Sequence, residues 1–209
     1  PDIKLQPSGK AAVDFKLNPA DDNNWQIVIH DIDVAADVEG YPLTLHGKLS
    51  LNQKLHWNFT DFSLMHAADS IRLDGIINEQ FQLGGEIDIK SVKPYLADSN
   101  GRAFGYFTVI GSKTQPWFDF EVFTDDVLFQ NNKVKRADFA GRINLTKPSE
   151  AVISLTAKEL NIGEQVINSV VLDYTAEKNS NDISFNIENA HNNAVLKVTG
   201  FWQGETWQG

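Results

Sequence analysis

Three histidines lie ten residues apart, at His46, His56 and His66. Imidazole nitrogens bind zinc and other transition metals, so three of them on neighbouring strands could form a metal site. The spacing matches no common ligand set, and the chain has no cysteine that could add a thiolate. The simpler interpretation is that these histidines are partly exposed strand residues. We therefore expect no bound metal and no cofactor.

Pairs of carboxylates are the second candidate for chemistry, and they are found at Asp21-Asp22, Asp31-x-Asp33 and Asp125-Asp126. Two carboxylates can hydrolyse a glycosidic bond, and clustered carboxylates can bind calcium. The first and last pairs lie in sequences typical of turns, while the middle pair alternates with Ile32 and Val34 as a solvated strand face. No twelve-residue calcium loop and no order of Ser, His and Asp typical of a catalytic triad is present. We expect the protein not to be an enzyme.

Composition limits the possible partners. Hydrophobic residues make up 42% and charged residues 22% of the 209 residues, which is ordinary globular usage. The net charge is −10 and the 18 basic residues are scattered, whereas a surface for nucleic acid needs clustered Lys and Arg. The sequence therefore excludes nucleic acid as the expected partner. The same acidity disfavours docking on anionic headgroups, so any contact with lipid would be apolar.

Apolar and polar residues alternate along nearly the whole chain. Val13, Phe15 and Leu17 alternate with polar residues, and the same pattern recurs up to Leu196 and Val198. A period of two places the apolar side chains on one face of a β-strand. Turn-forming residues separate the runs at the spacing of a meandering antiparallel sheet, which predicts roughly 14 to 16 short strands. The fold class is all-β, with a single short helical turn expected near residues 92–97, where Pro94 could begin it.

A short unit recurs within these strands: apolar, any residue, apolar, any residue, glycine. It ends at Gly47, Gly75, Gly111 and Gly200, with looser copies at Gly85 and Gly141. The copies lie about 26 to 30 residues apart or about twice that, which is typical of an extended array. Glycine on the apolar side of a strand usually marks a bulge or bend. Bends in register would curl a long antiparallel or mixed sheet into an apolar trough.

One stretch of the chain carries a family signature. Its three segments are Val92-Lys-Pro-Tyr-Leu96, Asn100-Gly-Arg-Ala-Phe-Gly105 and Val109-Ile-Gly-Ser-Lys-Thr-Gln-Pro116. They resemble the TamB family, as does the closing run from Leu196 to Gly204, and the similarity spans about residues 43–209. AsmA-like relatives share the same pattern. The resemblance implies a β-taco sheet, anchorage in the inner membrane, and a periplasmic location in a Gram-negative bacterium.

The resemblance also implies roles and partners. These are a TamA-like outer-membrane barrel reached through the full-length protein, phospholipid transport between the membranes, and assembly of outer-membrane proteins such as autotransporters. Residues 1–209 are expected to form a single elongated β segment excised from a longer repetitive periplasmic protein. The candidate residues lining a lipid groove are those on the apolar phase: Leu45, Leu49, Ile71, Leu73, Phe81, Leu83, Ile87, Phe107, Val109, Phe118, Phe120, Val122, Phe139 and Ile143.

Three functions remain open on these grounds. Acyl chains could lie in the trough while headgroups stay in water. Alternatively, an edge strand could pair with a nascent outer-membrane or passenger β-strand, as in a chaperone, without lipid transport. A weaker alternative is a carbohydrate-binding or adhesin β-solenoid, which would need exposed aromatics on the polar phase. Sandwich core is the competing structural explanation for the apolar residues, but the sequence shows no second layer to cover so long a face.

Overall fold

A computed structural model describes residues 8–17, 25–38, 41–93, 98–130, 132–177, 180–190, 192–203 and 206–208. Every regular element within these ranges is a β-strand. No helix long and apolar enough to span a membrane occurs in the described part of the chain. The all-β prediction is confirmed, as is the expected number of strands. The helical turn predicted near residues 92–97 falls mostly on residues 94–97, outside the described residues.

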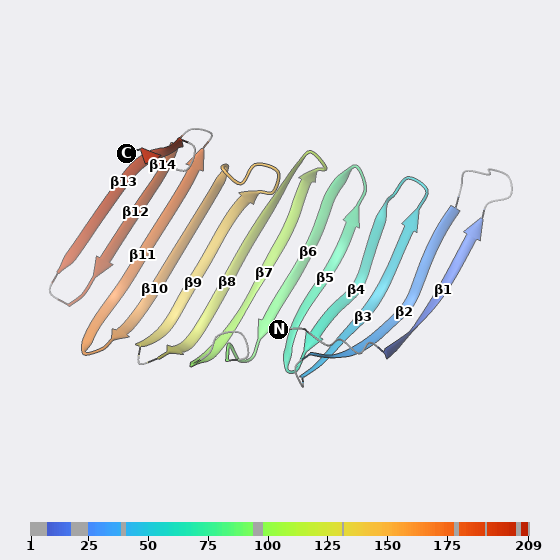
Figure 1. Ribbon diagram of the computed structural model, residues 1–209, viewed down its shortest axis with the longest axis horizontal. Coiled ribbons are helices and arrows are strands. Elements are labelled where there is room, and N and C mark those ends of the chain that lie inside the picture. Colours follow the sequence, from blue (N-terminus) through green and yellow to red (C-terminus); the bar gives the residue numbers. More distant parts are fainter. Residues whose placement is uncertain are drawn as a thin grey trace. The chain divides into compact units, whose positions relative to one another are not determined.

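Strand order in the sheet follows chain order from β1 to β14, and neighbouring strands run antiparallel wherever their register is defined (Figure 1). The strands are β1 (Ser8–Leu17), β2 (Trp25–Val38), β3 (Tyr41–Asn52), β4 (Trp57–His66), β5 (Asp69–Ile77), β6 (Gln80–Ile89), β7 (Ser99–Ser112), β8 (Gln115–Phe129), β9 (Asn132–Asn144), β10 (Ala151–Ile162), β11 (Gln165–Glu177), β12 (Ser180–Glu188), β13 (Asn193–Gln203) and β14 (Thr206–Gln208). Such an order needs only short hairpin connections, as the spacing of turn residues predicts.

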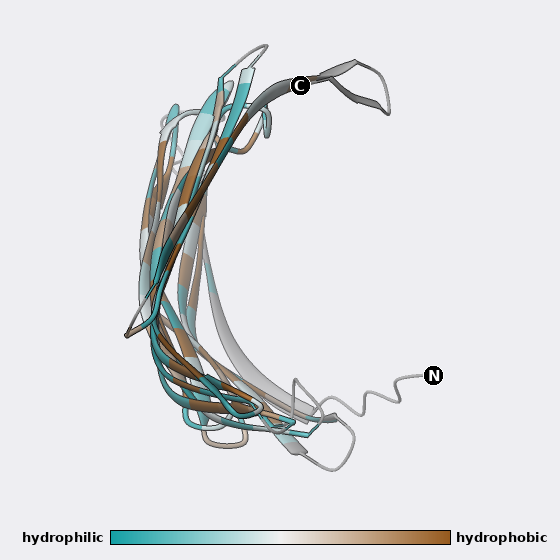
Figure 2. Ribbon diagram, turned by 90° about the vertical axis from the view of Figure 1, so that its left-hand side faces the viewer, coloured by the Kyte–Doolittle hydropathy of each residue, from teal (hydrophilic) through white to brown (hydrophobic). Residues whose placement is uncertain are grey.

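The chain divides into two compact units. Unit 1 comprises Pro1–Asp88 with Thr108–Pro116, and unit 2 comprises Ile89–Phe107 with Trp117–Gly209. In each unit the strands are bowed along their length (Figure 2). The described elements of each unit are all strands, so no helix or second sheet among them covers either face.

The bends in unit 1 lie where the alternation of apolar residues changes phase. In β2 the apolar residues are Ile27 and Ile29 before the bend, and Ile32 and Val34 after it. The residue between them, Asp31, has a left-handed backbone with φ 51°, and the register with β3 shifts at this point. The extra residue is a β-bulge, and it returns the apolar side chains to the same face.

The next strands of unit 1 continue the row of bends. Gly47 of β3 has φ 149°, Asp61 of β4 has φ 51°, and Gly75 of β5 has φ 134°. A Cβ added to Gly47 would lie 2.7 Å from a ring carbon and 2.8 Å from Cα of Phe62 on β4. Aspartate and glycine thus alternate from strand to strand. The missing Cβ of Gly47 leaves room for Phe62 beside the bulge of β4, whereas that of Gly75 leaves room for the backbone of Gln82 and Leu83 on β6. The prediction that glycines mark bends in register is confirmed at these two positions.

Unit 2 bends at dyads of polar residues. In β8, β9, β10 and β11 two consecutive polar residues separate apolar residues of opposite phase, at Asp125-Asp126, Lys135-Arg136, Lys158-Glu159 and Asn168-Ser169. The backbone is left-handed at Asp126, φ 49°, and at Glu159, φ 52°. The interpretation of Asp125-Asp126 as a turn is therefore wrong: the pair lies inside β8, because the left-handed residue bends the strand without ending it.

Few of the described side chains are fully buried, as expected for a sheet of a single layer. Among the described residues, the buried apolar side chains are mostly alanines, and the largest side chain that is fully buried is Asn144. Its Oδ1 accepts a hydrogen bond from the Thr146 N–H at 3.1 Å, and its amide donates one to Glu150 Oε2 at 3.0 Å. These bonds hold the turn between β9 and β10. The large apolar side chains lie on the sheet surface.

Candidate functional site: the apolar face

The strand register places the predicted groove residues of unit 1 on one face. Residues directly opposite each other on antiparallel strands project to the same side of a sheet. Ile71 of β5 lies opposite Leu64 and Ile87, and Gly75 lies opposite Phe59 and Leu83. The predicted residues of unit 1 that these pairings and the alternation bring together are Leu45, Leu49, Ile71, Leu73, Phe81, Leu83 and Ile87.

The corresponding face of unit 2 is aromatic where β7, β8 and β9 meet. Ring centroids lie 5.9 Å apart for Phe107 and Phe118, 5.5 Å for Phe118 and Phe120, and 4.9 Å for Phe120 and Phe139. A Cβ on Gly141 would lie 2.7 Å from the Phe120 ring, so this ring packs over the glycine. Offset aromatic pairs of this kind contribute about 0.5–1.5 kcal/mol beyond their buried area.

Three further predicted residues complete the set. Val122 lies opposite Phe139, and Ile143 lies opposite Phe118, so both belong to the apolar face of unit 2. Val109 follows Phe107 by two residues in β7 and has a half-buried side chain. Alternation gives it the same phase as Phe107.

The face is larger than the predicted residues alone. The register adds, in unit 1, Ile27, Ile29, Ile32, Val34, Phe59, Phe62 and Leu64. In unit 2 it adds Ile153, Leu155, Val170, Leu172, Tyr174, Ile183, Phe185, Ile187, Leu196 and Val198. The same period-two signal could have identified the second group. The first group was missed because its apolar phase changes at Asp31 and Asp61, and a single continuous period does not fit across a bulge.

The apolar face is open to solvent within both units. Ile71 is 41% exposed in unit 1, and Phe139 and Leu196 are 39% and 59% exposed in unit 2. Core residues of a closed sandwich would be covered by a facing sheet. A contiguous apolar surface with this exposure is typical of a surface that binds an apolar partner.

The opposite face of unit 2 is polar. Arg142 lies 3.4 Å from Asp119 and stacks its guanidinium 4.8 Å from the ring centroid of Trp117. Arg136 lies 2.9 Å from Asp138 and 5.7 Å from the ring centroid of Phe123. Trp117 and Phe123 on this side are therefore covered by arginines, whereas Phe104 and Tyr106, which share this side, are among the exposed large side chains.

Two basic side chains on the polar face of unit 2 have perturbed titration. The pKa of Lys135 is raised above 10.5, first by its hydrogen bond to Glu159 and then by the charge of that carboxylate. Its Nζ lies 2.7 and 2.8 Å from the two oxygens of Glu159. The hydrogen bond and charge of Asp138 likewise raise the pKa of Arg136. Both groups are exposed, so these pairs order the surface more than they stabilise the fold.

The residues first considered for chemistry lie apart from one another. His46 contacts Asp33 at 3.3 Å and His66 lies at the end of β4. In the described ranges, no three His or carboxylate side chains are grouped as metal ligands. The pair Asp21-Asp22 lies outside the described residues.

Each unit is an open antiparallel sheet with bowed strands and an exposed apolar face, which is the architecture of a groove-forming β protein. The family model described as "TamB, N-terminal domain" matches residues 1–209. The chain therefore belongs to the TamB family, as the signature around Gly105 and Gly111 predicted. It is similar to the "Translocation and assembly module subunit TamB" of Haemophilus influenzae, with 20% identity over 193 residues. The match covers 91% of this chain and 15% of that protein, and no solved structure matches the chain.

Proposed function

We propose that the chain is a segment of an envelope-biogenesis protein whose apolar face carries phospholipid acyl chains between the inner and outer membranes. Membership of the TamB family supports the broad role, since the relative is by name a translocation and assembly module subunit. The proposed location is the periplasmic part of an inner-membrane-anchored protein, working with a TamA-like barrel. The proposed role is transport or assembly and not catalysis.

The observation that carries the proposal is the open apolar face. In each unit, large apolar side chains of neighbouring strands lie opposite one another on one face. Several of these side chains are more than a third exposed. Removing a CH₂ group from water is worth about 0.8 kcal/mol, so a sixteen-carbon acyl chain gains about 12 kcal/mol before losses. A free surface of this kind is costly in water and favourable once covered by hydrocarbon.

The strand-pairing function is the alternative. An assembly factor would use backbone hydrogen bonds at a strand edge, and side chains on the apolar face would matter less. Carbohydrate binding is the third alternative: Tyr106 is an exposed aromatic of the polar phase, but arginines cover Trp117 and Phe123 on the same face. The two main functions therefore differ in which part of the strand touches the cargo.

The experiment uses the full-length protein with a photo-crosslinking amino acid in place of Ile87. We expect phospholipid adducts, and we expect Leu83→Asp to reduce them strongly, because a carboxylate on the same face must stay hydrated. Leu83 lies opposite Gly75 on the apolar face, whereas its neighbour Gln82 is exposed and lies opposite Ile76. Gln82→Asp is therefore the matched control, and it should leave adducts unchanged.

Thermal melting of both variants separates transport from folding. Leu83 is only half-buried, so its charged variant should retain a cooperative transition. If the Leu83→Asp protein folds and its lipid adducts are undiminished, the proposal that acyl chains move along the apolar face is refuted. Adducts with polypeptide instead of lipid at Ile87 would also refute it, and would assign the apolar face to a polypeptide cargo.

A further inference from the structure

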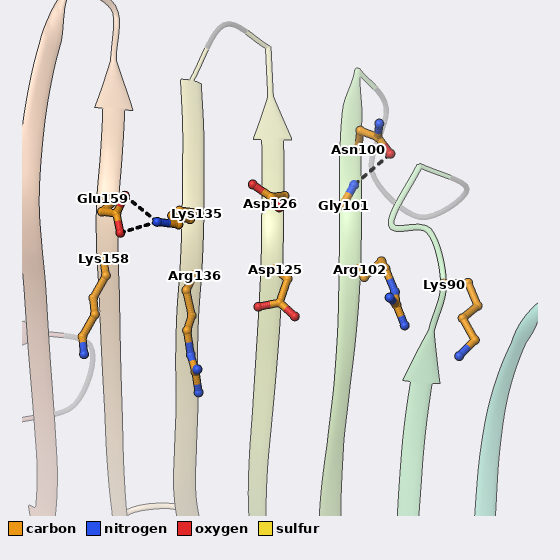
Figure 3. A pocket seen from close by; sticks show the side chains of 10 residues that line it. All are labelled: Lys90, Asn100, Gly101, Arg102, Asp125, Asp126, Lys135, Arg136, Lys158 and Glu159. Atoms are coloured by element: carbon orange, nitrogen blue, oxygen red, sulfur yellow. Dashed lines mark hydrogen bonds and ion pairs between the residues drawn. The ribbon is translucent and has the colours of Figure 1, made fainter.

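A shallow pocket of about 700 Å³ lies in unit 2, at the row of polar dyads. Its lining is charged, with five basic and three acidic residues, although the whole chain carries a net charge of −10. The residues that line it are Lys90, Asn100, Gly101, Arg102, Asp125, Asp126, Lys135, Arg136, Lys158 and Glu159 (Figure 3). This is a local excess of positive charge on an acidic protein.

The bend explains why so many charges meet here. In a regular strand, consecutive side chains point to opposite faces. The left-handed residues Asp126 and Glu159 interrupt this alternation, so both members of a dyad line the same pocket. Gly101 of β7 has φ 130°, and an added Cβ would lie 2.8 Å from Val127 Cα, which brings β7 close to β8 at the bend.

Four of the pocket side chains form a row across the strands. Asp125 lies opposite Arg136, and Arg136 lies opposite Lys158. Arg102 belongs to the same row, because Phe104, two residues further along β7, stacks on Phe123 of β8 at 5.2 Å. The order from β7 to β10 is therefore Arg102, Asp125, Arg136, Lys158, all on the polar face.

Most of the carboxylates near the row are already engaged. Glu159 is held by Lys135, and Asp126 by Lys133 at 3.0 Å. Arg136 is held by Asp138. Among the described residues, no carboxylate lies within ion-pair distance of Arg102 or Lys158. Because Arg136, which lies directly opposite Lys158, is already paired with Asp138, Arg102 and Lys158 are the cations of the row that are left to bind an external anion.

We infer that this pocket is a binding site for a ligand with several phosphate or similar oxyanion groups, held by Lys158 and Arg136 at one end and Arg102 at the other. Arg102 and Lys158 stand three strand spacings apart, which is about 14 Å. A single phosphate cannot reach both, whereas a linear chain of about six phosphates can. The site lies on the face opposite the apolar residues, so it is independent of the acyl-chain proposal.

Two sources could supply this chemistry: a soluble polyphosphorylated compound, or phosphates of a lipid surface. The first probe is a linear hexaphosphate, titrated into the purified chain by calorimetry at low ionic strength, with orthophosphate as the short-ligand comparison. The second probe is vesicles of phosphatidylcholine and phosphatidylglycerol, with binding measured by sedimentation. Vesicle binding that depends on the two cations assigns the lipid source. Binding of hexaphosphate alone assigns the soluble source.

Arg102→Gln and Lys158→Gln should each weaken hexaphosphate binding about fivefold, the scale of one exposed charge contact, and the double variant about 25-fold. Asp125→Asn should strengthen it, because it removes the carboxylate within the row. The matched control is Lys197→Gln, which deletes an exposed cation from the same face of unit 2, on β13. If Lys197→Gln weakened hexaphosphate binding as much as the pocket variants, the attraction would come from the overall charge of the face and not from the pocket. That result would overturn the inference. Equal affinity for orthophosphate and hexaphosphate, or no effect of the two substitutions, would also overturn it.

Discussion

The two units bend their strands in different ways. In unit 1 each left-handed aspartate lies near a glycine of the next strand, as for Asp61 and Gly75. In unit 2, β8 to β11 carry no glycine at the bend and place a polar dyad on every strand instead. Glycine solves the steric problem by removing the Cβ, whereas the dyads solve it by turning two side chains outward. The second solution concentrates charge on the surface, which the first does not.

The largest effect that this comparison predicts is at a glycine of unit 1. Gly75→Ala should lower the free energy of unfolding by about 3 kcal/mol, because the backbone there is left-handed and the new Cβ would meet backbone atoms. An added Cβ would lie 2.8 Å from Leu83 Cα and still closer to the Gln82 carbonyl oxygen. Urea unfolding of the purified chain measures the change.

The control for this substitution is on the facing strand. An added Cβ at Gly84 meets no atom within 4 Å. Gly84→Ala should therefore be neutral or stabilise slightly by restricting the unfolded chain. If both variants lose the same stability, the bend does not depend on glycine.

A smaller effect is expected at the left-handed residue of unit 2. Asp126→Val should lower the free energy of unfolding by about 1–2 kcal/mol, since a β-branched side chain disfavours a positive φ. Asp126→Gly should leave the free energy of unfolding nearly unchanged. Glycine adopts φ 49° without steric strain, but this gain is offset by the greater freedom of the unfolded chain. The same urea titration distinguishes them. Equal stability of the valine and glycine variants would show that backbone conformation is not what limits this bend.

The smallest effect concerns the charges that the dyads bring together. The pKa of Lys135 is raised by Glu159, so the contribution of this pair is present below pH 10.5 and is lost as pH rises through the raised pKa. Wild type and Lys135→Gln should differ in Tm by no more than about 2 °C at pH 8. The difference should disappear toward pH 12. A difference that persists there would assign the effect to packing of the lysine stem.

The sequence predicted what is local and missed what depends on neighbouring strands. Alternation predicts that Phe118, Phe120 and Val122 lie on one face, because this pattern can be recognised within the sequence of β8 alone. The bulge at Asp61 was not predicted, because it lies at a shift in register between β4 and β5, which the sequence of β4 alone does not specify. The position of Asp126 inside a strand was missed for the same reason. Two consecutive aspartates are usual in turns, and only the paired dyad of β9 shows that the strand continues.

The order of the strands has a consequence for how the chain folds. In the strand order, every pair of neighbours is consecutive in the sequence, so no pairing joins strands that are far apart along the chain. Chains dominated by local pairing fold quickly, because little loop entropy is lost before contacts form. A sheet of this order can grow by adding one hairpin at a time as the polypeptide emerges, with the most recent strand serving as the template for the next.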